Sequence, residues 1–160
     1  MADDQVQLRR AHPSDADAIA EVWLRSRRAS VPAIPPPTHS GDEVRVWLAD
    51  AVLPTRVVWV ATVEDTVIAM LVLDNGWIDQ LYVDPSHTGR GIGSQLVGVA
   101  KHDHPDGRDL WTFASNDGAR RFYERLGFVA VATTDGDNEE AAPDVRYRWS
   151  GLESRAQIAP

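Results

Sequence analysis

The sequence contains no cysteine, so it forms no disulfide, has no thiolate metal site and offers no thiol nucleophile. Basic residues are few: 16 Lys and Arg stand against 24 Asp and Glu, which gives a formal net charge of −8. Nucleic-acid binders usually carry a basic balance or patch, so we expect no nucleic-acid partner. The longest apolar run, residues 67–73, is far shorter than the ~18 residues of a membrane helix. The amino terminus, MADDQVQLRR, lacks the apolar segment of a signal peptide. These absences predict a cytoplasmic protein with no membrane partner.

The remaining composition is typical of one globular domain. The chain has 160 residues, of which 43% are hydrophobic, and this is enough to bury a sizeable core. We place one domain at residues 1–150 and a tail at residues 151–160. The hydrophobic periodicity predicts strands at residues 6–11, 56–63, 66–73, 77–83, 109–114, 128–133 and 144–149. This order predicts an α/β (α+β) fold, with a mixed, mostly antiparallel sheet of about six or seven strands flanked by about four helices.

The predicted helices are bounded by recognisable capping residues. Ser14 is expected to cap a helix at residues 15–28, and Ser40 to cap a second one. A third helix follows the glycine-rich segment near residue 90. Asn116 begins the last helix, and Gly127 ends it.

The segment SHTGRGIGSQL, residues 86–96, places glycines at 89, 91 and 93 directly before the third helix. Glycine has no side chain to bury, so we expect these three positions to serve close approach of the backbone rather than packing. A loop that opens a helix points N–H groups at one spot, which suits a pyrophosphate, and Arg90 adds a cation. The alternative is a plain turn with a solvated arginine. The glycine spacing and the absence of G-K-[ST] fit neither a dinucleotide fingerprint nor a P-loop.

Two segments carry a resemblance to a known family. LYVDPSHTGRGIGSQLV, residues 81–97, resembles the coenzyme A-binding segment of the GNAT-type N-acetyltransferase superfamily. NDGARRFYERLGF, residues 116–128, resembles that family's N-x-x-A-x-x-[FY]-[FY]-E-x-x-G-F segment. The resemblance covers about residues 5–149. Thr88 departs from it, because it stands where the family has Gln or Arg, and Arg90 is expected to compensate.

The resemblance implies acetyl-CoA as the acyl donor and no metal. It implies acetyl transfer to a primary amine of a small molecule or peptide, by direct attack in a ternary complex. A backbone N–H within residues 81–83 would hold the oxyanion, and Tyr123 would reprotonate the leaving thiolate. The expected donor-binding residues are Leu81, Tyr82, Val83, Thr88, Gly89, Arg90, Gly91, Ile92, Gly93, Ser94, Asn116, Ala119 and Tyr123.

A general base is needed because an alkylamine is protonated at neutral pH. Asp79 is the expected base, with Glu139, Glu140 and Asp144 of the acidic segment 135–144 as rivals. The resemblance implies an acceptor pocket at Trp23 and Trp77, with Glu140 contributing if that segment folds over it; Trp47 is a further candidate. Clustered acids would also attract a cationic amine.

Simpler interpretations stay open. Tyr123 is also suited to be a core residue, Asn116 a plain N-cap, and residues 135–144 a solvated hairpin tip. His102 and His104 are expected to lie in a solvated loop rather than on a metal. The alternative function is an acyl-CoA-binding sensory module with little or no transferase activity. An unrelated nucleotide-binding protein is the third hypothesis, and a homodimer is left open as the assembly.

Overall fold

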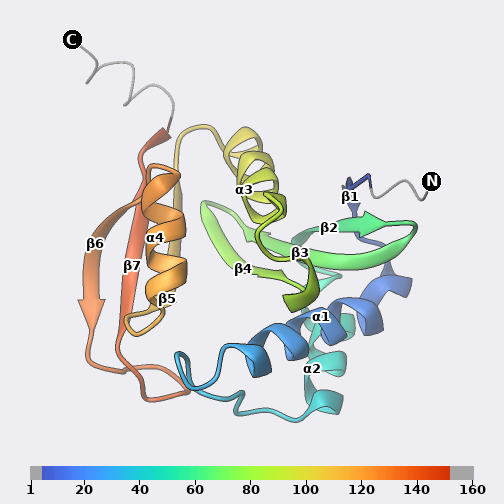
Figure 1. The fold of residues 1–160 in the computed structure, drawn as a ribbon, viewed down its shortest axis with the longest axis horizontal. Coiled ribbons are helices and arrows are strands. Elements are labelled where there is room, and N and C mark those ends of the chain that lie inside the picture. The colour runs from blue at the N-terminus through green and yellow to red at the C-terminus, as the bar shows by residue number, and fades with distance from the viewer. Residues whose placement is uncertain (1–4, 152–160) are drawn as a thin grey trace.

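A computed structural model describes residues 5–151 and contains a seven-stranded sheet in the order β1-β2-β3-β4-β5-β7-β6 (Figure 1). The strands are β1 Gln7–Arg10, β2 Val57–Val63, β3 Thr66–Asp74, β4 Trp77–Val83, β5 Arg108–Phe113, β6 Val129–Thr134 and β7 Asp144–Trp149. All pairs are antiparallel except β4 with β5. The predicted fold class is thereby confirmed. The predicted tail, residues 151–160, lies outside the described residues except for Gly151.

Four α-helices flank this sheet in the described residues: α1 Ala16–Ala29, α2 Gly41–Trp47, α3 Ile92–Asp103 and α4 Asp117–Arg125. Helices α1 and α2 share a buried apolar cluster with one face of β2 and β3, whereas α3 and α4 cover the opposite face (Figure 1). Short 3₁₀ helices lie at Pro13–Asp15 and Pro85–His87, and a π-helical segment at Leu48–Val52 continues α2. None of these helices is long and apolar enough to cross a membrane.

The capping predictions hold at three of four places. The Ser40 hydroxyl accepts from the Glu43 N–H at 3.2 Å, and the Asn116 side chain accepts from the Ala119 N–H at 3.1 Å. Gly127 follows the end of α4 with φ +92°, which a glycine adopts without strain. The prediction for Ser14 was wrong, because this residue lies inside a short 3₁₀ turn and Asp15 precedes α1.

Two irregularities of β4 create the site. Gln80 pairs with Val72 and Ile78 pairs with Leu73, so Asp79 is an extra residue that forms a β-bulge. In addition, β4 pairs with β5 only at Trp77 and Asp109. Beyond that pair the two strands diverge, and the sheet opens between them.

Candidate active site

A cleft of about 770 Å³ runs through the opening between β4 and β5. One wall comes from the end of β4, the glycine loop and α4; the other comes from α1, β5 and the start of β7. Of the predicted donor-binding residues, the cleft is lined by Leu81, Tyr82, Val83, Thr88, Gly89, Gly91, Ile92, Gly93, Ser94, Asn116, Ala119 and Tyr123. Arg90 is exposed and does not line it. The fold therefore brings together two segments that lie some thirty positions apart in the sequence.

The glycine loop has the geometry of a backbone cradle at two of its three glycines. Gly89 and Gly91 have φ of +77° and +79°, and a Cβ built on either one would meet nothing within 4 Å. The first turn of α3 begins at Ile92, and the Gln95 N–H is bonded back to the Gly91 carbonyl. The N–H groups of residues 92–94 precede that bond and lack a partner within the helix. They are free to bind an anion.

The expectation that none of these glycines serves packing was wrong for Gly93. A Cβ at Gly93 would lie 3.1 Å from the Phe122 ring, closer than most real contacts. Gly93 therefore lets α3 approach α4 closely at the Phe122 ring. Thr88 lines the loop, and its hydroxyl donates to the Pro85 carbonyl at 3.3 Å.

The backbone of β4 presents free N–H groups to the opening. The Asp84 N–H donates to the Ile68 carbonyl of β3 at 2.7 Å. Because N–H groups alternate between the two sides of a strand, those of Val83 and Leu81 point away from β3. The Val83 carbonyl, which lies on the same side, accepts from the Ser26 hydroxyl of α1 at 2.8 Å. Two N–H donors therefore face the region that β5 leaves vacant.

Tyr123 lies at the base of this opening. It is 8% exposed, and its ring makes edge contacts with Phe122 and Phe128. Burial raises the pKa of Tyr123 well above its ordinary value, and the nearby Tyr82 phenol acts in the same direction. The hydroxyl is therefore held in its protonated form at neutral pH. Asn116 lines the cleft and also caps α4, so its two predicted roles coexist.

Asp79 does not line the cleft. Its carboxylate forms an ion pair with Arg56 at 2.6 Å, and about a third of the side chain is exposed. Burial raises the pKa of Asp79, whereas Arg56 opposes that shift. The cause of its placement is the bulge: strict alternation would put Asp79 on the same face as Leu81 and Val83, but the extra residue turns it away.

The predicted acceptor residues also lie outside the cleft lining. Trp23 is 7% exposed, and its Nε1 donates to the Gln80 side chain at 3.1 Å. It contacts the cleft indirectly, because its ring packs edge-on against Tyr82, and Trp47 packs on it at 6.4 Å. Trp77 lies at the far end of β4, under the Arg146 guanidinium.

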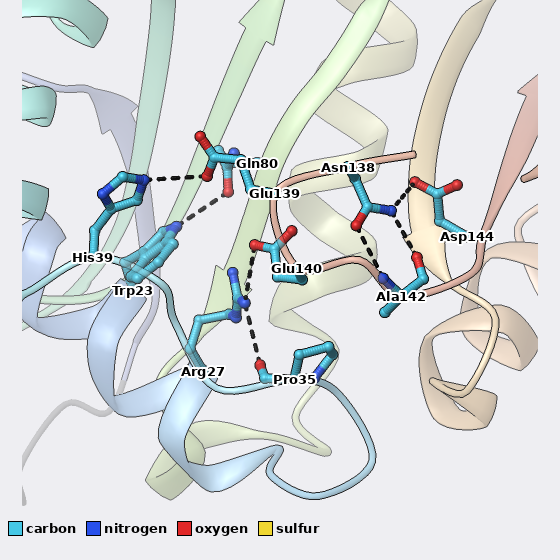
Figure 2. Close-up of polar contacts among 10 residues, drawn as sticks. All are labelled: Trp23, Arg27, Pro35, His39, Gln80, Asn138, Glu139, Glu140, Ala142 and Asp144. Atoms are coloured by element: carbon cyan, nitrogen blue, oxygen red, sulfur yellow. Dashed lines mark hydrogen bonds and ion pairs between the residues drawn. The ribbon is translucent and has the colours of Figure 1, made fainter. Parts of the chain in front are cut away.

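The segment 135–143 crosses from β6 to β7 and is fastened to the α1 and α2 side (Figure 2). Glu139 pairs with His39 at 3.1 Å. Glu140 pairs with Arg27 at 3.6 Å, and Arg27 also donates to the Pro35 carbonyl at 3.3 Å. Both glutamates are therefore engaged by cations of the chain itself.

Several cleft residues were not foreseen. The cleft is lined by Ser26 and Ala29 of α1 and by Ser30, which caps that helix; their helical spacing signals one shared face. Ile34 lines the cleft beyond them. His87, Trp111, Thr112, Phe113 and Arg125 also line it, and no sequence pattern distinguished them. In the described residues, no group of three or more His, Cys, Asp or Glu is placed to hold a metal ion.

Comparison with known proteins shows which family this chain resembles. Residues 54–130 match the family model of the acetyltransferase (GNAT) domain. The peptidyl-lysine N-acetyltransferase YjaB of Escherichia coli strain K12 is 29% identical over 141 residues, 83% of this chain and 88% of that protein. The chain is similar to the GNAT acetyltransferases, in its central segment by sequence and over most of its length by fold. The predicted resemblance is confirmed, and with it the class of acetyl-CoA-dependent N-acetyltransferases.

Solved GNAT structures share the fold described above. The solution structure of apo YjaB from Escherichia coli has a TM-score of 0.74 at 24% identity and covers 92% of this chain and 99% of that one. A crystal structure of the PaiA N-acetyltransferase of Thermoplasma acidophilum in complex with coenzyme A has a TM-score of 0.69 at 17% identity. It covers 91% of this chain and 99% of that one.

Proposed function

We propose that this protein transfers the acetyl group of acetyl-CoA to a primary amine of a small molecule or peptide, by direct attack within a ternary complex. One observation carries the proposal: a single cleft joins the open glycine loop, the free N–H groups of Leu81 and Val83, and the buried hydroxyl-bearing Tyr123. An anion cradle, an oxyanion donor and a proton donor are the parts that acyl transfer from a thioester requires.

The residues present fit the donor. The first turn of α3 offers N–H groups to the pyrophosphate, and Gly89 and Gly91 leave the space beside them open. Arg125, which also lines the cleft, supplies a cation for the phosphates. When bound, acetyl-CoA supplies an activated thioester carbonyl. The wall formed by Leu81, Val83 and Tyr123 would hold that carbonyl at the opening of the sheet.

The acceptor nitrogen must first lose a proton. An alkylamine with a pKa near 10.4 is held in its charged form at pH 7 by about 4.6 kcal/mol. As the N–C bond forms, the Leu81 or Val83 N–H donates to the oxyanion. As the C–S bond breaks, Tyr123 gives its proton to the sulfur. The nitrogen, which became cationic when the N–C bond formed, releases its second proton to solvent, and Tyr123 recovers a proton from solvent.

The name of the Escherichia coli relative makes the lysyl side chain the first acceptor to test. The protein should be incubated with acetyl-CoA and a panel comprising a lysyl peptide, a peptide with a free α-amine, a polyamine and an arylamine. Free thiol should appear only with an acceptor, together with the acetylated product by mass. Binding of acetyl-CoA without thiol release for any amine would contradict the proposal and favour a sensory module.

A further inference from the structure

Asp144 is the only carboxylate among the cleft-lining residues that the structure describes. The other acids near the opening are engaged elsewhere. Asp79 is ion-paired with Arg56, Glu139 with His39, and Glu140 with Arg27. Any negative charge that the cleft offers to a substrate therefore comes from one residue.

The carboxylate of Asp144 is held by neutral groups. Its Oδ1 accepts from the Thr134 hydroxyl. Its Oδ2 accepts from the Asn138 side-chain amide at 3.2 Å, as Figure 2 shows. Asn138 is itself fixed, because its side chain bonds both the N–H and the carbonyl of Ala142. No Lys, Arg or His of the described residues forms an ion pair with Asp144. A carboxylate has about four acceptor sites, so two remain for a further donor.

The side chain of Asp144 lies on the face of the sheet opposite to the face that α3 and α4 cover. Its neighbour Val145 is 1% exposed and packs in the core beneath α3 and α4, together with Tyr123. Side chains alternate along a strand, so Asp144 points to the other face, where α1 lies. It is paired with Phe113 of β5, next to the buried Arg27 that holds Glu140. An acceptor that enters from the α1 side meets this carboxylate before it reaches the opening.

We propose that Asp144 binds the ammonium group of the acceptor, and that the acceptor is therefore a cationic primary amine. The inference rests on the proposed function. Thr134 and Asn138 act as positioning residues, because they orient the carboxylate without neutralising it. Asp144 orients the nitrogen and raises its local concentration. The proton that leaves before attack passes to solvent.

The test compares two acceptors that differ in charge: a lysyl peptide blocked at both ends, and aniline, which is neutral at pH 7.5. Asp144→Asn should raise KM for the lysyl peptide about tenfold or more, the effect of losing a charge-assisted hydrogen bond. The KM for aniline and the calorimetric Kd for acetyl-CoA should stay within about twofold. Raising the salt concentration should shrink the difference between the variants.

Asp137→Asn is the matched control. Asp137 is exposed, and its substitution removes one negative charge from the connection that leads to Asp144. It should change neither KM. If Asp144→Asn does not bind acetyl-CoA, Asp144→Ser, which keeps an acceptor for Asn138, replaces it.

The outcomes separate the two claims. If the wild-type protein acetylates both amines while Asp144→Asn keeps the wild-type KM for the lysyl peptide, the assignment of Asp144 is overturned and the proposed function stands. Equal rises in KM for both amines would also overturn it. If the wild-type protein binds acetyl-CoA but acetylates neither of these amines nor any other amine of the panel above, the proposed function fails together with this inference.

Discussion

The Arg27 guanidinium of α1 lies 3.6 Å from the Glu140 carboxylate of the segment before β7, with only 5% and 15% of the two side chains exposed. Arg27 also lies 5.0 Å from the Trp23 ring centroid, and its Nε has no hydrogen-bond partner. A buried cation is costly unless a carboxylate compensates it. Glu140 therefore fastens one half of the molecule to the other by neutralising Arg27.

Glu140→Gln should lower the free energy of unfolding by about 3 kcal/mol, since it leaves a buried charge without its counter-ion. Urea denaturation measures the change. Glu139→Gln is the control, because Glu139 and its partner His39 are both exposed and an exposed pair contributes little. A double-mutant cycle with Arg27→Met should recover most of the loss. Equal stability of the two glutamine variants would show that Arg27 does not depend on Glu140.

Tyr123→Phe should reduce the rate of acetyl transfer more than the affinity for acetyl-CoA. The ring keeps its contacts with Phe122 and Phe128, while the hydroxyl is lost. We expect a reduction near the low end of the range of about 10²–10⁴ for acid–base residues, because a thiol is itself fairly acidic. Single-turnover kinetics from pH 6 to 9 measure it. An unchanged rate across this range would leave Tyr123 as a core residue only.

Gly91→Val should abolish detectable acetyl-CoA binding in calorimetry. The open space beside Gly91 accepts a side chain, but that side chain then occupies the place of the pyrophosphate. The variant also loses about 1–2 kcal/mol of stability, because φ is +79° at this position. Gly98→Ala is the control: Gly98 lies in α3, the helix that Gly91 precedes, with open space around it, and the variant should retain full affinity. A folded Gly91→Val protein with wild-type affinity would remove the loop from the donor site.

The His39 side chain should titrate above the ordinary histidine pKa. Glu43 and Glu139 both bond its ring nitrogens and raise its pKa. Because the folded-state value is raised, the link to Glu139 is fully present below the ordinary pKa of ~6.5 and is lost as pH rises through the raised value. NMR titration of the His39 ring measures its pKa, and Glu139→Gln should lower that pKa part of the way toward the ordinary histidine value. If the His39 pKa is the same in the wild-type protein and in Glu139→Gln, then His39 does not hold the segment 135–143 in solution.

Local sequence signals were sufficient where one residue decides the geometry. Asn116 could be predicted as a cap because its own side chain bonds the first turn of α4, and Gly91 because only its backbone is used. Asp79 could not be placed, because a single extra residue in β4 reverses the alternation of side chains and leaves no mark in the composition. Arg27 stands near the end of a helix, where a cation is ordinarily solvated, and its burial depends on a segment more than a hundred positions away. Gly93 likewise depends on Phe122, a neighbour that only the packing of two helices reveals.

The single pairing of Trp77 with Asp109 has a consequence for hydrogen exchange. In most sheets an interior strand protects its amides on both sides, but β4 is an interior strand protected on one side only. The amides of Leu81 and Val83 should therefore exchange with deuterium much faster than that of Asp84, which is bonded to Ile68. Acetyl-CoA lying along β4 would slow the exchange of the Leu81 and Val83 amides and leave that of the Asp84 amide unchanged. The ligand would then take the place of a missing neighbouring strand.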